Sequence, residues 1–205
     1  MPESSRHHRP ALPGAAHFDA LPGEDDPAIR SEAADRCATL LVRGARDSAD
    51  QAVVARVVSL AETEGLETLA DLWAGSGADS LAGCLWRLYL LRTWVYADPV
   101  AAAAEFDTGR WHTPVHEAVA GVVEPPGPDE VRLLVDQVLR GVAEGDFADT
   151  LYRAAAFARV VSAGRAHLTH DARSTYAHDL SAAKLATMAE QLEHAAKLEV
   201  DGLLS

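Results

Sequence analysis

The sequence contains few cysteines and few positive charges, and both shortages exclude classes of protein. Two cysteines, Cys37 and Cys84, are too few for a disulfide framework, and neither has a partner at zinc-site spacing. Eighteen Lys and Arg stand against 31 Asp and Glu, which gives a net charge of −13. So acidic a chain repels phosphate backbones at long range, which argues against generic binding to nucleic acid or to an anionic membrane.

Long hydrophobic runs are also missing. The first ten residues, M-P-E-S-S-R-H-H-R-P, have no apolar stretch behind their charges, so we expect no signal peptide. The most apolar segment, Leu81 to Val95, contains two arginines and is too short to cross a bilayer. These features predict a soluble, cytoplasmic protein without a membrane partner.

Strand signals are absent as well, because no run of β-branched and aromatic residues alternates with polar ones. Apolar residues instead recur at three- and four-residue steps between short Gly, Pro and Asp punctuation. With 205 residues, 48% of them hydrophobic, the chain can bury one sizeable core. The pattern predicts an all-α fold, a compact multi-helix bundle of about eight or nine helices with no sheet. We expect a mobile N-terminal arm over residues 1–25 and a single helical domain over residues 26–205.

Capping residues give expected bounds for the helices. Asp26-Pro27 predicts a helix start, Gly44 its end, and its expected inward stripe is Ile29, Ala33, Cys37, Leu40 and Leu41. Further helices are expected over about Ser48 to Gly65, Leu66 to Trp73, Leu81 to Tyr96, Asp98-Pro99 to about Phe106, Thr113-Pro114 to about Val123, Pro128 to Gly141, Asp146 to Gly164, and about Arg173 to about Val200.

Histidines form the first candidate site. His112 and His116 lie four apart in W-H-T-P-V-H-E, and on one helix that spacing can hold a metal. Pro114 disfavours helical backbone at the preceding residue, so we expect His112 just outside the helix and His116 in its first turn. A second cluster consists of His167, His170, Asp171 and His178. It could bind a divalent transition metal or shuttle protons, as in a metal-binding protein or an enzyme. A polar loop that enters a helix also explains these residues.

The apolar helix from Leu81 carries the second candidate site. Arg87 and Arg92 lie on this helix beside Trp86. An unpaired buried charge is very costly, so each arginine must reach the rim of the core or pair with a carboxylate. The alternative is that Trp86, Arg87 and Arg92 bind a small anionic ligand.

Catalytic signatures are lacking. There is no G-x-S-x-G, neither cysteine lies beside a histidine, and G-S-G-A-D-S follows a helix, whereas a phosphate loop follows a strand. We therefore expect a non-catalytic interaction or scaffold protein without a cofactor, which binds a protein partner or a second copy of itself. Exposed Trp or Leu on the second half of the Leu81 helix, or the Ala-rich stripe of the C-terminal helix, would supply the contact.

Several segments together resemble a known family. They are H-F-D-A-L-P-G-E-D-D-P-A-I, L-A-D-L-W, L-A-G-C-L-W-R-L-Y-L-L-R-T-W-V, P-P-G-P-D-E-V and G-D-F-A-D-T-L-Y-R-A-A-A-F-A-R-V-V-S-A-G-R. The chain resembles a family of small all-helical actinobacterial proteins of about this length, some of which carry the name "DNA-directed RNA polymerase subunit beta". The resemblance implies an all-helical fold over nearly the whole chain and assigns no site residues. The acidic sequence has no basic pattern typical of a nucleic-acid channel.

Overall fold

The computed structural model describes residues 27–44, 66–113, 127–133, 135–136, 147–168 and 181–205. Nearly all of them are helical and none is in a strand, which confirms the all-α prediction for this part of the chain. The helices are α2 (Pro27–Arg43), α4 (Leu66–Trp73), α5 (Leu81–Ala97), α6 (Pro99–Arg110), α8 (Phe147–Leu168) and α9 (Ala182–Val200). Helical residues over 128–136 bring the described total to seven, against an expectation of eight or nine. The expected N-terminal arm and the helices over 48–65 and 113–123 lie outside the described residues.

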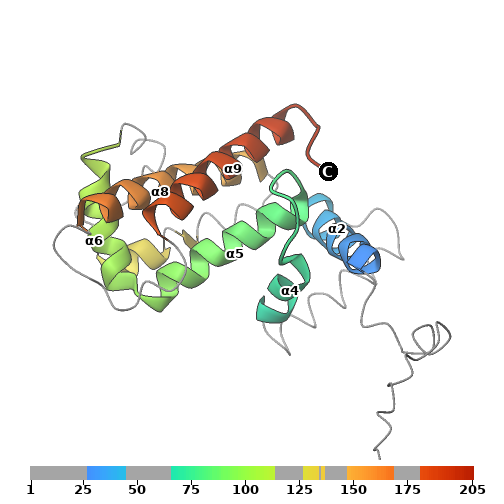
Figure 1. Ribbon diagram of the computed structural model, residues 1–205, viewed down its shortest axis with the longest axis horizontal. Coiled ribbons are helices and arrows are strands. Elements are labelled where there is room, and N and C mark those ends of the chain that lie inside the picture. The colour runs from blue at the N-terminus through green and yellow to red at the C-terminus, as the bar shows by residue number, and fades with distance from the viewer. Residues whose placement is uncertain (1–26, 45–65, 114–126, 134, 137–146, 169–180) are drawn as a thin grey trace, which may run out of the picture.

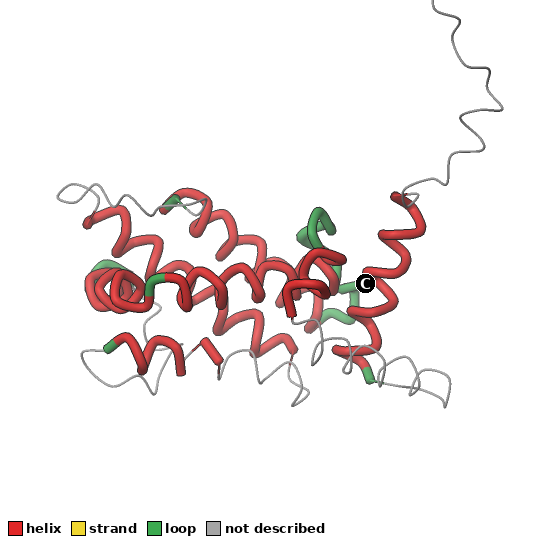
Figure 2. The backbone as a smooth tube through the Cα atoms, turned by 90° about the horizontal axis from the view of Figure 1, so that it is seen from below, coloured by secondary structure: helices red, strands yellow, loops and turns green. Residues whose placement is uncertain are grey.

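Helix α8 packs along α9 and is crossed by α6 (Figure 1). Figure 2 shows the helices from below, with no strand among the described residues. Helix α5 runs antiparallel to α9: the Leu81 N–H at its start donates to the Ser205 backbone oxygen, 2.8 Å away, beyond the end of α9. Helices α2 and α4 pack near the start of α5, at the end of the molecule opposite α6 (Figure 1). No described helix combines the length and the apolar character needed to cross a bilayer.

Local signals in the sequence set several of these bounds. Asp98 ends α5 and begins α6, where its carboxylate accepts from the Ala101 N–H at 3.0 Å and Pro99 occupies the first turn. Gly44 ends α2 with a φ of 77°, a conformation that costs glycine little. Both bounds confirm the predictions made from the capping residues.

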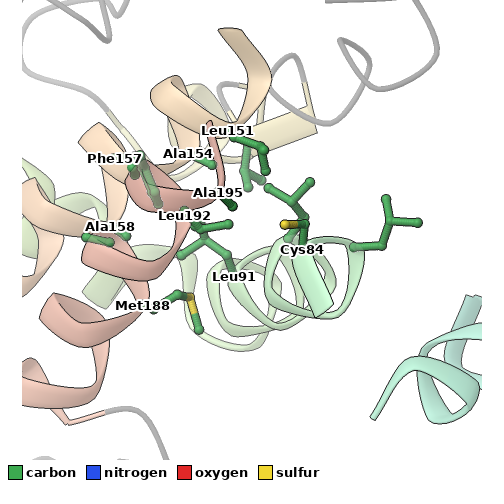
Figure 3. Packing of buried hydrophobic residues seen from close by; sticks show 14 of the residues in the cluster. Cys84, Leu91, Leu151, Ala154, Phe157, Ala158, Met188, Leu192 and Ala195 are labelled. Carbon is green, nitrogen blue, oxygen red and sulfur yellow. The ribbon is translucent and has the colours of Figure 1, made fainter. Parts of the chain in front are cut away.

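The core forms where α5, α8 and α9 meet (Figure 3). Its largest fully buried side chains come from all three helices and include Leu88, Leu91, Leu151, Phe157, Leu185 and Leu192. The Ala-rich stripe of α9 belongs to this core, because Ala189, Ala195 and Ala196 are fully buried and α9 packs closely on α8. That stripe is therefore not available as the face for a second copy.

Two glycines carry helices α6 and α8 past their expected ends. Helix α6 continues beyond Phe106 to Arg110, and α8 continues beyond Gly164 to Leu168. A Cβ added at Gly109 would lie 1.8 Å from the Val160 carbonyl oxygen, and one added at Gly164 would lie 1.7 Å from the Glu105 carbonyl oxygen. The predicted stop at Gly164 is wrong because this glycine allows two backbones to touch and does not cap a helix.

Two other predictions about the helices also need correction. Helix α9 begins at Ala182 and not near Arg173, because the Ser181 hydroxyl accepts from the Lys184 N–H at 3.3 Å and caps the helix there. In α2 the buried residues are Ala34, Cys37, Ala38 and Leu40, whereas Ile29 is 64% exposed. The expected stripe and the observed one share Cys37 and Leu40, and packing against α4 and α5 selects the neighbouring face.

Candidate anion-binding groove between α5 and α9

Helices α5 and α9 lie side by side (Figure 1). An open groove of about 350 Å³ lies between them. Helix α9 packs mainly on α8 and touches α5 much less, which leaves room for the groove. Its volume is at the lower end of the range for small-molecule sites. The lining residues are Trp86, Arg87 and Leu90 from α5, and Ala183, Lys184, Thr187, Met188 and Gln191 from α9.

Arg87 is partly buried in this groove and is bound only to neutral groups. Its Nε donates to Gln191 Oε1 at 2.8 Å, and its Nη1 donates to the Gly83 carbonyl oxygen at 2.8 Å. No carboxylate among the described residues forms an ion pair with it. Burial lowers the pKa of the guanidinium, and the charge of Asp79 acts in the opposite direction. Arginine nevertheless stays charged at neutral pH, so the groove contains a fixed positive charge.

Further donors lie close to the Arg87 guanidinium. Its Nη2 makes no hydrogen bond within the part of the chain that is described. The Gln191 carbonyl oxygen faces Arg87 Nε, so the amide nitrogen of Gln191 is left to donate elsewhere. Lys184 lies in the first turn of α9, a turn without acidic residues, where the helix dipole also favours an anion. Both helices therefore bring positive potential to one opening.

The remaining lining of the groove is apolar except for Thr187. The Trp86 indole stacks on the Tyr89 ring with centroids 5.8 Å apart and an interplanar angle of 21°. Leu90 is partly buried and Met188 is buried, and Met188 lies between α9 and α5 near Leu91 (Figure 3). The groove thus combines apolar surface with positive charge, a combination typical of small-ligand sites.

Arg92, the third predicted ligand residue, is engaged elsewhere. Its Nε lies 3.1 Å from Asp136 Oδ1, and its guanidinium lies 4.1 Å from the centroid of the Tyr96 ring. The Tyr96 hydroxyl donates to Asp136 Oδ2 at 2.5 Å, and this hydrogen bond raises the pKa of Tyr96. Arg92 therefore joins α5 to Asp136 by an ion pair. Pairing with a carboxylate was the expected alternative to ligand binding for an arginine on this helix.

Two of the predicted metal ligands meet, although they are far apart in the sequence. His112 follows α6, His167 lies in the last turn of α8, and their rings stack with centroids 3.8 Å apart and an interplanar angle of 8°. The His167 Nδ1 lies 2.8 Å from the Ala163 carbonyl oxygen, so that nitrogen carries a proton. Both side chains are exposed.

This stack does not have the geometry of a metal site. The lone pair of an imidazole nitrogen lies in the ring plane, so two stacked, nearly parallel rings cannot aim at one ion without rotating. Within the described ranges no group of three His, Cys, Asp or Glu side chains is placed to hold a metal. The other predicted ligands, His116, His170, Asp171 and His178, lie outside those ranges, and a site that includes them stays a prediction.

Sequence reasoning identified the α5 half of the groove and missed the α9 half. Thr187, Met188 and Gln191 carry no signal of their own, because their role depends on α9 lying against α5. The one local signal was the run from Ala183 through Thr187 to Gln191 at four-residue spacing, which places these residues on one helix face. The proximity of Arg87 to that face is a tertiary contact between positions 104 residues apart.

Comparisons with known proteins found no match: no family model, no curated protein and no solved structure is similar to this chain. The resemblance to the small actinobacterial family stays a prediction. Functional reasoning for this protein therefore starts from the groove itself, its charges and its lining.

Proposed function

We propose that this protein is a non-catalytic binding protein, and that the groove between α5 and α9 binds a small anionic ligand. Arg87 carries the proposal, because its partly buried guanidinium is bound to two neutral oxygens, those of Gln191 and Gly83. Removing a charge from water without a counter-charge is unfavourable, and a bound anion would offset that penalty. We place this function in the cytoplasm, as the sequence features predict.

The ion pairs of other arginines support a specific role for Arg87. Several other arginines on the packed helices have carboxylate partners: Arg43 pairs with Glu199, Arg159 with Glu193, and Arg165 with Glu105. Arg30 donates to a neutral acceptor, the Asp71 carbonyl oxygen, but from an exposed position where its charge stays hydrated. In a chain with a net charge of −13, carboxylates outnumber cations and partners are plentiful. An arginine in a groove that instead contacts only neutral acceptors and stands near Lys184 is arranged to receive a negative charge from outside the chain.

Titration of the protein with small anions tests this function. The ¹⁵N–¹H signals of the Arg87 Nε–H and the Trp86 indole would be followed as acetate, hexanoate, octanoate and inorganic phosphate are added. At least one anion should shift both signals with saturation. Arg87→Met keeps most of the apolar stem and removes the charge, so it should abolish the Trp86 shift.

Arg153→Met provides the matched control. Arg153 is an α8 arginine that does not line the groove, and its side chain is 34% exposed beside Asp149. Its replacement removes the same charge and should leave anion binding unchanged. If no anion in the panel produces a saturable shift in the parent protein, or if both variants lose binding equally, the proposed function is wrong.

A further inference from the structure

We infer that the ligand of this groove is an amphipathic monocarboxylate, a single carboxylate carried on an apolar chain or ring. This inference rests on the proposed function and deepens it by naming the ligand class. It combines three features: the donors that remain free in the groove, the apolar residues that line it beside them, and the net charge of the whole chain.

The free donors suit a carboxylate. Two of the five N–H groups of Arg87 are used by Gln191 and Gly83, and three, including both on Nη2, are left for a ligand. A carboxylate needs only two oxygens satisfied, which the guanidinium edge and the Gln191 amide can supply together. Lys184 adds one more charge at the edge of the groove. A phosphate dianion would match the charges of Arg87 and Lys184 but would leave the apolar part of the lining uncovered, so the lining decides between the two anions.

The apolar part of the lining calls for a ligand with a hydrophobic body. Trp86 and Leu90 of α5 and Ala183 and Met188 of α9 give the groove apolar surface on both helices, and a fully hydrated ion would leave that surface in contact with water. An alkyl chain or aromatic ring attached to the carboxylate would cover it. Met188 is flexible and can adapt to chains of different shape, and the Trp86 indole offers a flat face.

The net charge of −13 argues in the same direction. A strongly acidic protein repels multiply charged anions at long range more than singly charged ones. A monocarboxylate experiences the smallest repulsion and gains part of its binding free energy from apolar contact, which the net charge does not weaken. Charge and lining therefore select the same ligand class.

A chain-length series tests the inference on the whole protein. Acetate, butyrate, hexanoate and octanoate would be titrated against the Arg87 and Trp86 signals, alongside inorganic phosphate and the neutral hexanoamide. Burying one methylene is worth about 0.8 kcal/mol, or about fourfold in affinity, and in an open groove we expect roughly half of that free energy, about twofold for each methylene. Octanoate should therefore bind at least about tenfold more tightly than butyrate, and hexanoate at least about tenfold more tightly than hexanoamide.

Two variants separate binding in the groove from binding elsewhere. Ala183→Asp places a carboxylate at the groove beside Lys184, where the first turn of α9 tolerates an acid, and should weaken octanoate binding at least about tenfold. Ala182→Asp adds the same charge to the same turn at a residue outside the lining, and should change affinity far less. Thermal unfolding of both variants would show that the fold is retained.

The outcomes distinguish this inference from the proposed function. If acetate or phosphate binds as tightly as octanoate and Arg87→Met abolishes binding, the groove binds anions and the amphipathic class is wrong. If hexanoamide binds as tightly as hexanoate, the carboxylate is irrelevant and both proposals fall. Loss of octanoate binding in Ala182→Asp to the same extent as in Ala183→Asp would also overturn the inference, because the effect would not be local.

Discussion

Replacing Gly164 by alanine should weaken the contact between α6 and α8, the tightest backbone approach in the described helices. The new Cβ would lie 1.7 Å from the Glu105 carbonyl oxygen and 2.9 Å from the Gly109 nitrogen. Ordinary van der Waals contact begins near 3.4 Å, so the helices must separate locally by about 1.7 Å. Because the obstacle is backbone, no side chain can rotate to relieve the clash.

Two opposing effects set the magnitude of this change. Alanine is preferred over glycine inside a helix by about 1 kcal/mol, which alone would stabilise the variant. Overpacking a filled contact costs about 1–3 kcal/mol and sometimes more, and a clash between backbones belongs at the upper end. We therefore expect the free energy of unfolding to fall by about 2 kcal/mol or more, with a Tm lower by about 5 °C or more.

Urea unfolding followed by tryptophan fluorescence measures the effect, since the chain contains four tryptophans. Ala166→Gly, at an exposed position in the last turn of α8, calibrates the propensity term and should cost no more than about 1 kcal/mol. If Gly164→Ala proves as stable as the parent protein, or more stable, α6 and α8 do not touch through their backbones and this account of the crossing is refuted.

Two further predictions follow from buried ionisable groups. Burial raises the pKa of Glu105 above its ordinary value of 4.5, while Arg165 opposes the shift. The folded state therefore holds more protons than the unfolded state just above pH 4.5, so the free energy of unfolding should fall as pH rises there. Glu105→Gln should lack this component when urea midpoints are compared from pH 4.5 to 7, and parallel curves would contradict the assignment. Burial also raises the pKa of Cys84 to about 12 and that of Cys37 above its ordinary value. Neither thiol should therefore react quickly with a disulfide reagent at pH 8 until guanidinium unfolds the chain. Rapid labelling of the folded protein would show that the thiols are accessible and contradict this prediction.

Local sequence signals predicted the helices whose limits are set by neighbouring residues. Asp98-Pro99 and Gly44 act within a few residues of themselves, and the structure confirms both bounds. Gly164 gave the opposite result, because a glycine that ends a helix and one that permits a crossing look alike in the sequence. What distinguishes them is the opposing backbone, some 55 residues away along the chain.

The candidate site was predictable only in part, for the same physical reason. The apolar surroundings of Arg87 on its helix indicated that its charge needs a partner, and this follows from the cost of burying a charge. Local sequence does not distinguish Arg87 from Arg92, since both lie on one helix and differ only in what packs against them. Asp136 reaches Arg92, whereas Gln191 reaches Arg87, and only the packing of α9 and residues 128–136 assigns these neighbours.

The most direct test of the central claim is a crystal structure of the protein with octanoate bound. We predict that the carboxylate lies within hydrogen-bond distance, about 3 Å, of the Arg87 guanidinium, with the alkyl chain along Trp86, Leu90 and Met188. A structure in which octanoate binds elsewhere would contradict the claim. So would one in which a carboxylate of the protein itself forms an ion pair with Arg87 and fills the groove.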